Sequence, residues 1–410
     1  VQYLVCNGDE GDPGAFMNRT IMESDPFQLL EGMMIAAYAM GVEEAFIYTR
    51  AEYPLAITTI ESAIGSLREN ELLGENILGV EGFNLDIKVK VGAGAFVCGE
   101  ETALMNSIMG FRGHPWPRPP YPAEKGIWGR PTNINNVGTL SNVTCIFKNG
   151  VEEYSHVGTS QSSGTKIICL TGKIKNPGVI EVPFGTRLKQ IVYDIGGGPP
   201  GDSKVKAVQS GGPAGGCIPG HSLDVPLDYE SLQEAGAIMG SGGIVVMNNH
   251  DCMVDVARYF MNFTQQESCG KCTPCREGTM RLLELLEKIT SGVGSKSDLL
   301  LIDRLADFVG ESSLCGLGQN APNPIKSTLK FFMNEYVAQV KKKKCPAGVC
   351  TGMKKYMITS ECVGCGNCAK TCPVDAITGS LREKHVIDQD VCVKCGKCAT
   401  QCAFNAIESG

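Results

Sequence analysis

The first 150 residues alternate between two patterns of hydrophobic and polar positions, one with the period of a strand and one with that of a helix. Residues 1–6 (VQYLVC) form an apolar run that predicts a buried strand. The later elements predicted here are a helix capped by Ser24 and ending at Gly41, a strand at 45–48, a helix at 54–70 and a strand at 85–91. This order predicts a largely parallel sheet, with ligand-binding loops at the carboxyl ends of its strands.

The pattern then changes three times along the chain. Short strands separated by Gly and Pro clusters predict a small α+β domain, and a helical region follows it. Four consecutive lysines, Lys341 to Lys344, open a segment whose composition resists helix formation and is expected to pack poorly. The predicted boundaries are 1–159 for the α/β domain, 160–250 for the α+β domain, 251–340 for the helical domain, 341–353 for a linker and 354–410 for a cysteine-rich module.

Composition is typical of a soluble globular protein. Of the 410 residues, 43% are hydrophobic and 20% are charged, and no apolar run reaches the roughly 18 residues that direct membrane insertion requires. The net charge of −7 argues against nucleic acid as a partner, because phosphate binding depends on clustered Lys and Arg. The chain begins on a predicted strand without an initiator Met, so we expect it to be the C-terminal part of a longer protein.

The number and spacing of the cysteines are the features of the composition that an ordinary soluble protein does not share. Eleven of the 20 cysteines lie in three runs, separated by two or three residues, a spacing typical of metal or cluster ligands rather than of disulfides. Free thiols in such runs favour a reducing, cytoplasmic environment.

The C-terminal module carries the strongest of these motifs, because its two halves repeat the ligand run of bacterial ferredoxins. In such modules the fourth cysteine of each run binds the other cluster. One [4Fe–4S] cluster is therefore expected on Cys362, Cys365, Cys368 and Cys402, and a second on Cys392, Cys395, Cys398 and Cys372. A zinc module is the alternative, although zinc sites rarely show a doubled run.

Two further groups of cysteines are candidate ligands. SCGKCTPCR at residues 268–276 supplies three ligands for a third [4Fe–4S] cluster or, alternatively, a structural zinc; the set is Cys269, Cys272 and Cys275, with Cys315 as the candidate fourth. Cys345 and Cys350 stand in the linker, where a zinc ion, a [2Fe–2S] cluster and no metal at all are equally compatible with the pair. Cys252 is a weaker third ligand, and most of the remaining cysteines are expected to be plain core residues.

Two glycine-rich acidic loops follow predicted strands. NGDEGDPG at residues 7–14 places Asn7, Asp9, Glu10 and Asp12 at the carboxyl edge of the sheet. GAFVCGEE at 94–101 leads into a helix predicted at 102–109, whose first N–H groups are available to a phosphate or a ring carbonyl. Taken singly, either loop is equally compatible with turns and helix caps alone.

Together with PRPPYPA, GRPTNINNVGTL and SCGKCTPCREG, these loops resemble, in the same order, the flavin subunit of respiratory complex I and its relatives over residues 1–340. The resemblance implies NADH oxidation at FMN, a Rossmann-like FMN-binding domain, a β-grasp domain containing SGGPAGGCIP and a helical [4Fe–4S] bundle. Positions matching flavin contacts are Asn7, Asp9, Glu10, Gly99, Glu100, Glu101, Asn135 and Asn136. Positions matching NADH contacts are Asp12, Glu101, Arg118 and Tyr121.

Two departures from the family pattern bear on these sites. Asp12, Arg118 and Tyr121 stand where Glu, Lys and Phe are common, which leaves the preference between NADH and NADPH open. The family's Gly-rich flavin loop lies upstream of the strand on which this chain begins, so only part of the flavin site is expected here.

The added 2[4Fe–4S] ferredoxin module makes the chain most similar to the beta subunits of electron-bifurcating [FeFe]-hydrogenases, and also similar to related transhydrogenases and formate dehydrogenases. This resemblance implies an NADH dehydrogenase module, with hydride transfer beside Glu100 and Glu101 and electron exit through the Cys269 cluster. The partners it implies are a hydrogenase or other catalytic subunit, a thioredoxin-like [2Fe–2S] subunit and ferredoxin. A flavin-free electron relay and a structural adaptor are the alternatives.

Overall fold

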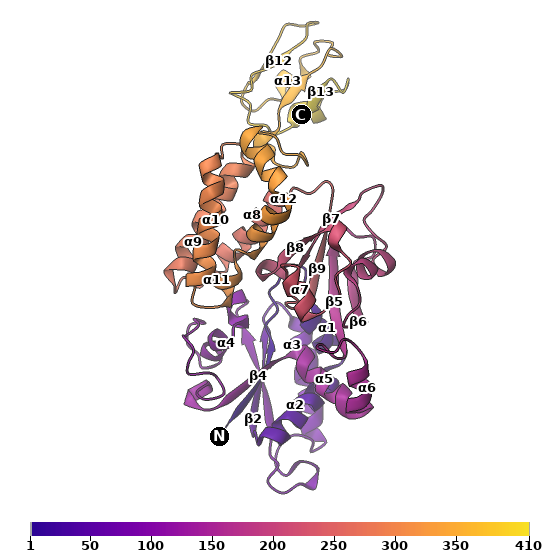
Figure 1. The fold of residues 1–410 in the computed structure, drawn as a ribbon, viewed down its shortest axis with the longest axis vertical. Coiled ribbons are helices and arrows are strands. Elements are labelled where there is room, and N and C mark those ends of the chain that lie inside the picture. The colour runs from indigo at the N-terminus through magenta and orange to yellow at the C-terminus, as the bar shows by residue number, and fades with distance from the viewer. Residues whose placement is uncertain (1, 410) are drawn as a thin grey trace.

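The computed structural model describes residues 2–409, so Val1, the first residue of the predicted N-terminal strand, lies outside the described residues. Figure 1 shows an α/β domain that contains the N-terminus, a mixed-sheet domain and a helical bundle side by side above it, and a small module at the far end of the bundle.

The N-terminal domain is built on four parallel strands in the order β3-β2-β1-β4. The strands are β1 (Tyr3–Gly8), β2 (Glu44–Arg50), β3 (Asp86–Gly92) and β4 (Thr132–Asn136). The helices are α1 (Met17–Ser24), α2 (Pro26–Met40), α3 (Pro54–Glu69), α4 (Glu101–Ile108), α5 (Val137–Asn149) and α6 (Val151–His156). Alternate residues of β1 serve opposite faces: Leu4 joins the core beneath α1, α2, α3 and α5, and Val5 packs with α4.

The α/β domain differs from the predicted pattern at several elements, since α1, α5 and α6 were not predicted. Ser24 ends α1, and Asp25 instead caps α2 by accepting a hydrogen bond from the backbone N–H of Gln28. Gly41 ends α2 with φ of 65°, as the helix stop predicted. The pattern did not reveal β4 (TNINN), because asparagine is disfavoured in strands and only pairing with β1 holds this segment extended.

The mixed-sheet domain confirms the small α+β domain. Its five strands lie in the order β6-β5-β9-β7-β8, and only β5 and β9 are parallel. The elements are β5 (Thr165–Gly172), β6 (Gly178–Pro183), a π-helical turn (Gln190–Ile195), β7 (Val205–Ser210), β8 (Gly216–Pro219), α7 (Tyr229–Glu234) and β9 (Gly243–Asn248).

The helical bundle follows directly. Its helices are α8 (Met253–Gln266), α9 (Thr273–Thr290), α10 (Lys296–Ser312), α11 (Gly316–Asn320) and α12 (Asn323–Lys341). A buried ion pair joins it to the mixed sheet, since Lys206 Nζ lies 2.5 Å from Glu335 Oε1. Within the described residues, no helix is long and apolar enough to cross a bilayer.

The terminal module consists of two copies of one half-unit. Its elements are β10 (Tyr356–Ile358), α13 (Asn367–Lys370), β11 (Ile377–Thr378), β12 (Val386–Ile387), α14 (Lys397–Thr400) and β13 (Ile407–Ser409). β10 pairs with β13, and β11 pairs with β12, both antiparallel.

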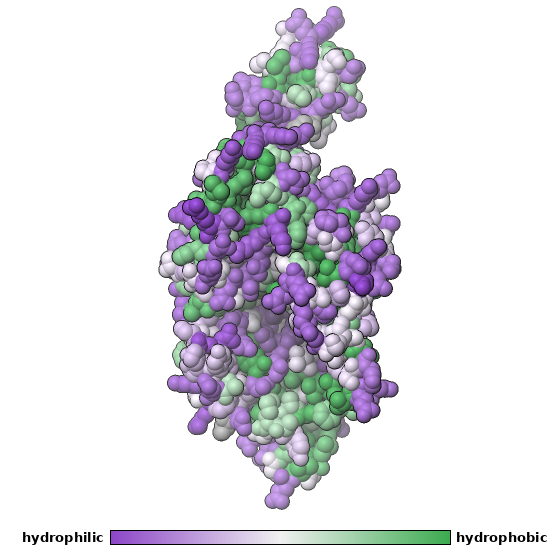
Figure 2. Space-filling model, in the orientation of Figure 1, coloured by the Kyte–Doolittle hydropathy of each residue, from purple (hydrophilic) through white to green (hydrophobic). Residues whose placement is uncertain are grey.

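The expectation that residues 341–353 pack poorly is wrong for three of them. Cys345, Cys350 and Met353 are buried and belong to the core of the helical bundle. The four lysines before them are exposed, so the composition predicted the exposure of these lysines correctly but did not predict that the cysteines pack into the bundle. Figure 2 shows hydrophilic side chains gathered at this junction between the module and the bundle.

Candidate functional site

A cavity of about 790 Å³ lies between the α/β domain and the mixed-sheet domain. Four of the predicted flavin positions, Asn7, Asp9, Gly99 and Asn136, line it. They reach it from three segments: the end of β1, the loop before α4, and the end of β4. Because parallel strands end at the same edge of a sheet, residues more than 120 positions apart in the chain meet here.

Asparagine side chains hold these segments together. Asn7 Nδ2 donates to the carbonyl of Gly99 at 2.9 Å, and Asn7 Oδ1 accepts from the backbone N–H of Asp9 at 3.1 Å. Asn136 Oδ1 caps α5 by accepting from Gly138 N, and its Nδ2 donates to the carbonyl of Asn7 at 3.3 Å. The two loops and β4 therefore form one hydrogen-bonded edge.

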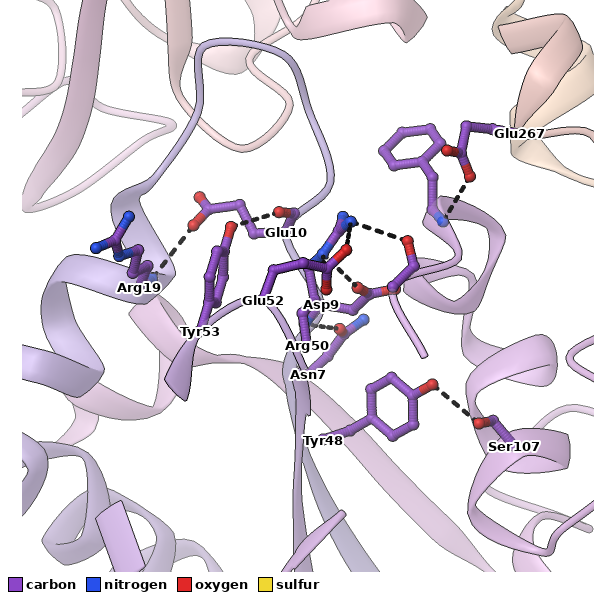
Figure 3. Close-up of polar contacts among 12 residues, drawn as sticks. Asn7, Asp9, Glu10, Arg19, Tyr48, Arg50, Glu52, Tyr53, Ser107 and Glu267 are labelled. Carbon is purple, nitrogen blue, oxygen red and sulfur yellow. Dashed lines mark hydrogen bonds and ion pairs between the residues drawn. The ribbon is translucent and has the colours of Figure 1, made fainter. Parts of the chain in front are cut away.

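Asp9 lies beside Arg50 at this edge (Figure 3), and its pKa is raised further than that of Glu10 or Asp12. Burial raises its pKa to about 7; Arg50 opposes the shift, and Glu52, Glu267 and Asp12 add to it. Arg50 Nε lies 4.0 Å from Asp9 Oδ1, and the same guanidinium bonds Glu52 and the carbonyl of Gly94. Asp9 Oδ2 is buried with no hydrogen-bond partner.

The other two acids of the first loop face protein groups. Glu10 accepts from the backbone N–H groups of Met17 and Arg19 at the start of α1, while burial raises its pKa to about 7. Asp12 accepts from the Ser241 hydroxyl and lies against Gly212 of the mixed-sheet domain, and burial raises its pKa to about 6. Neither residue lines the cavity.

The remaining predicted positions lie away from the cavity lining. Glu100 caps α4 by accepting from the backbone N–H groups of Thr102 and Ala103. Glu101 forms an exposed ion pair with Arg118 at 3.0 Å. Tyr121 is exposed, and Asn135 Nδ2 donates to Asn133 Oδ1.

The loop that carries Cys269, Cys272 and Cys275 is fastened to the α/β domain. The backbone N–H of Phe96 donates to Glu267 Oε2 at 2.9 Å, and Lys271 Nζ donates to the carbonyl of Pro115. His114 Nε2 and Arg112 both contact the carbonyl of Cys269.

The three cysteines of this loop and Cys315, which precedes α11, lie close enough for their charges to affect the pKa of Cys275. Burial raises the pKa of Cys275 to about 11; Ser268 opposes that shift, and Cys272, Cys315 and Cys269 add to it. A bound metal centre would stabilise the thiolate form that the apoprotein disfavours.

The terminal module holds two small cavities, and each is lined by four cysteines. Cys362, Cys365, Cys368 and Cys402 line one, and Cys372, Cys392, Cys395 and Cys398 line the other. In both sets, three cysteines come from one run and the fourth from the other run. The chain thus crosses over between the two halves, in the arrangement of two-cluster ferredoxins.

Cys252, Cys345 and Cys350 form a tighter group, with all three Sγ atoms within 4.8 Å of one another. Cys350 Sγ and Cys252 Sγ are 3.7 Å apart. A tetrahedral ion with metal–sulfur bonds of ~2.3 Å holds its sulfur ligands roughly 3.8 Å apart. Hydrogen bonds within the group lower the pKa of the Cys345 thiol and raise the pKa values of Cys252 and Cys350, so without a metal the group favours a single thiolate, on Cys345.

Three residues of the site were not expected from the sequence. Asn18 lines the cavity, and its buried Oδ1 has no hydrogen-bond partner. Arg50 ends β2 at the same edge as Asn7, a position that strand order alone could have suggested. Glu267 is separated from its partner Phe96 by 171 positions, and no local pattern indicates such a contact.

Comparison with known protein families agrees with this geometry. Residues 1–145 match the Nuo51 FMN-binding domain, 167–217 an SLBB domain, 255–339 the NADH-ubiquinone oxidoreductase-F iron–sulfur binding region, and 361–406 a 4Fe-4S dicluster domain. The chain is 52% identical over 385 residues to the NADP-reducing hydrogenase subunit HndC of Solidesulfovibrio fructosivorans, covering 94% of this chain and 78% of that protein. It belongs to the complex I flavin and iron–sulfur subunit family.

Other members of this family support the same assignment. An NADH-quinone oxidoreductase subunit of Rhizobium meliloti is 43% identical, covering 84% of this chain and 82% of that protein. The solved NAD+-reducing [NiFe]-hydrogenase in the H2-reduced state is 35% identical, with a TM-score of 0.76 over 83% of this chain. The chain spans 56% of the length of that solved chain. The family confirms an α/β multidomain fold with FMN-binding, SLBB and 4Fe-4S regions, in an NAD(H)-dependent oxidoreductase module of multi-subunit enzymes.

Proposed function

We propose that this chain is the NAD(H)-oxidising subunit of an electron-bifurcating hydrogenase and that its cavity would hold FMN. The observation that carries the proposal is the cavity, which brings Asn7, Asp9, Gly99 and Asn136 together from three segments. A flavin supplies the exchange between two-electron and one-electron chemistry that this reaction needs.

The residues present fit a flavin. Asp9 Oδ2 and Asn18 Oδ1 are buried acceptors without partners, and both residues line the cavity. A ring N–H or a ribityl hydroxyl would satisfy such acceptors, and an unsatisfied buried acceptor otherwise costs about 1–3 kcal/mol. Asn7, Gly99 and Asn136 would hold the group at the edge of the sheet, with Asn136 at the N-terminus of α5.

Nucleotide binding is proposed for the exposed positions. Glu101 and Arg118 form an ion pair that a nucleotide can reach, and Tyr121 offers an exposed ring to a base. Glu100, which caps α4, and Glu101 would border the path of the hydride; Glu10 and Asp12 would position the first loop through their protein contacts. Asn135 would act from the end of β4.

Three [4Fe–4S] clusters are proposed as the electron acceptors. Cys269, Cys272, Cys275 and Cys315 would hold the one nearest the flavin domain, and the two sets of four cysteines in the terminal module would hold the others. Cys252, Cys345 and Cys350 would hold a zinc ion, because three thiols around one point suit a single ion better than the paired ligands of a [2Fe–2S] cluster.

The proposed partners are a hydrogenase subunit, a thioredoxin-like [2Fe–2S] subunit and ferredoxin, in the cytoplasm. Support comes from the relative at 52% identity, which is a subunit of an NADP-reducing hydrogenase, and from the ferredoxin-like module of this chain. The name of that relative also makes NADPH a proposed alternative to NADH.

The test is flavin content and turnover of the purified complex. Asn136→Ala is expected to lower FMN per complex at least severalfold and to lower NADH-dependent reduction of ferricyanide in proportion. The matched control is Asn70→Ala, which removes an exposed asparagine that bonds only its own helix. Full activity in a complex without flavin would contradict the proposal and support a flavin-free electron relay. Formate oxidation or transhydrogenation without hydrogen turnover would show that the complex is not a hydrogenase.

A further inference from the structure

A tight turn between β2 and α3, residues 50–53 (RAEY), contacts both glycine-rich loops of the site (Figure 3). The backbone N–H of Tyr53 donates to the carbonyl of Arg50 at 3.1 Å and closes the turn. The backbone N–H of Ala51 donates to the carbonyl of Gly92 at 3.0 Å and fastens the turn to the end of β3. The turn is therefore fixed by the sheet, and its side chains extend from a rigid position.

The guanidinium of Arg50 joins the two loops. Its Nη2 donates to the carbonyl of Gly94 at 2.8 Å, in the loop before α4. Its Nε lies 4.0 Å from Asp9 Oδ1, in the loop after β1. The backbone of that loop passes so close to Nη1 that a Cβ at Gly11 would collide with it, so this position requires glycine. One side chain thus sets the distance between two loops that are far apart in the chain.

Two neighbouring side chains strengthen this junction. The Tyr53 hydroxyl donates to the carbonyl of Glu10 at 2.7 Å, so the turn holds a second point of the loop after β1. Glu52 Oε1 lies 3.0 Å from Arg50 Nη2 and orients the guanidinium. A Cβ at Gly94 would collide with the Glu52 carboxylate, so the loop before α4 lies against this pair as well.

Arg50 faces only one oxygen of Asp9. Asp9 Oδ1 lies toward the guanidinium, while Oδ2 is buried without a hydrogen-bond partner among the described residues, and Asp9 lines the cavity. The Arg50 side chain is 14% exposed, so solvent screens its charge little. Burial raises the pKa of Asp9 to about 7, and the charge of Arg50 limits that rise. Arg50 therefore favours the carboxylate form of Asp9 and leaves Oδ2 free to accept from a ligand.

The other ionisable groups that interact with Asp9 become negative when they ionise, so they oppose its carboxylate form. They are Glu52, Glu267, Asp12, Tyr48, Tyr53 and Cys98. Replacing Arg50 by a neutral residue should therefore raise the pKa of Asp9 further, so that most of Asp9 would be protonated at neutral pH.

We propose that Arg50 is a positioning residue of the flavin site, which joins the two glycine-rich loops and keeps Asp9 as a carboxylate with Oδ2 free for a flavin N–H. The proposal rests on the proposed function, because it takes FMN as the ligand of the cavity. Arg50 does not line the cavity, so it acts through Asp9 and Gly94. A hydrogen bond to a carboxylate is stronger than one to a neutral acid. FMN affinity is therefore expected to rise with pH as Asp9 ionises, around pH 7.

The test is FMN binding by the purified complex after its flavin has been removed, followed by quenching of FMN fluorescence at several pH values on both sides of 7. Arg50→Gln should move the midpoint of the pH profile up by about one unit, which weakens FMN binding about five- to tenfold at neutral pH. Arg50→Lys keeps the charge but cannot make the same bridge, so it should weaken binding by one factor at every pH and keep the midpoint. Arg68→Gln, which breaks an exposed pair with Asp86 in the same domain, should keep the parent profile.

Asp9→Asn separates the charge of Arg50 from its bridge between the loops. It should abolish the midpoint, because Glu10 and Asp12 do not line the cavity. Arg50→Gln, added to Asp9→Asn, should then weaken FMN binding equally at every pH. Iron content and Tm report whether each variant assembles.

Each outcome decides the proposal. The parent midpoint in Arg50→Gln would overturn it, because Arg50 would then be a structural residue only. Parent affinity in Arg50→Lys would also overturn it, because the bridge would not be needed, and this variant decides the case if Arg50→Gln does not assemble. A parent complex that binds no FMN would refute the proposed function, a result that the FMN content of the untreated complex shows separately.

Discussion

The flavin side and the ferredoxin-like module are joined to the helical bundle in opposite ways. The Cys269 loop is held by contacts from several segments of the α/β domain, including Phe96, Arg112 and His114. The module is held by one short segment, through the three thiols near Cys345 and the bond from Lys394 to Gly352. The first junction is therefore fixed by contacts from several segments, whereas the second depends on a single joint, residues 341–356.

The largest effect is expected from the buried ion pair that belongs to the rigid part. Glu335 is 3% exposed; it pairs with Lys206 and accepts from the backbone N–H of Met253. Glu335→Ala leaves the partly buried ammonium of Lys206 with only the carbonyl of Asp251 and leaves the N–H of Met253 without its acceptor. The change should cost about 3 kcal/mol of unfolding free energy and roughly 6–12 °C in Tm, measured by circular dichroism.

The control for this variant is Lys326→Gln, which breaks an exposed pair with Asp307. It should cost less than about 1 kcal/mol, because solvent screens exposed pairs. Digestion within residues 341–356 should stay unchanged in both variants. Faster digestion there in Glu335→Ala would mean that the module and the rigid part are not separate.

A second effect concerns the pH dependence of the fixed junction. Burial raises the pKa of Asp9 to about 7 from 3.8; Arg50 opposes the shift, while Glu52, Glu267 and Asp12 add to it. The folded chain then holds a proton that the unfolded chain has lost, so the contribution of Asp9 is full below about pH 4 and is lost as the pH rises through about 7. The loss between pH 5 and 7.5 is on the order of 2 kcal/mol.

Asp9→Asn should remove the share of this slope that Asp9 contributes and leave the share of Glu10 and Asp12, because burial also raises their pKa values, to about 7 and about 6. Urea unfolding at several pH values measures the difference. Glu267→Gln should move the midpoint of the Asp9 share to lower pH, because one of the negative charges that raise the pKa is gone. If neither variant changes the slope, titration of Asp9 does not contribute to the pH dependence of the unfolding free energy.

Sequence patterns predicted the fold better than they predicted the site. Strands, helices and cysteine runs have periods and spacings that a single chain displays, and the crossed cysteine sets of the module follow from one rule. β4 was missed because its residues do not favour a strand, and pairing alone fixes it. The same limit hid the position of Asp12, whose partner Ser241 belongs to another domain.

The linker shows the converse error. Its lysines predicted a loose segment, yet Cys345 and Cys350 are buried against Cys252, 93 and 98 positions earlier. The sequence suggested the pair of thiols with Cys252 as a weaker third ligand, and the structure brings the three together. It did not suggest that the segment joins the core of the helical bundle, because long-range contacts of this kind leave no local pattern.

A third effect tests the single joint. Replacing Cys345 and Cys350 by Ser should release one zinc ion per chain, measured by metal analysis, and speed cleavage within residues 341–356. A shift of about 1.4 kcal/mol in local opening would raise the cleavage rate tenfold. Cys145→Ser, at a half-buried thiol outside the group, is the control. Unchanged zinc and unchanged cleavage would show that the thiols are only core residues and that the joint is held elsewhere.

The smallest stability effect should come from the exposed pair of Arg118 and Glu101, which sets the scale for the others. The two side chains are 42% and 43% exposed, so Arg118→Gln should change the unfolding free energy by less than about 0.5 kcal/mol.

An arginine near a nucleotide site accommodates a 2′-phosphate, whereas a carboxylate binds the free ribose hydroxyl. Arg118→Gln should therefore raise KM for NADPH more than KM for NADH, at unchanged Tm. Arg68→Gln, which breaks an equally exposed pair with Asp86 at 2.6 Å, is the control for charge alone. If both variants change KM equally, Arg118 acts only through net charge. If Arg118→Gln lowers Tm as much as Glu335→Ala does, burial is not what separates the fixed junctions from the exposed surface.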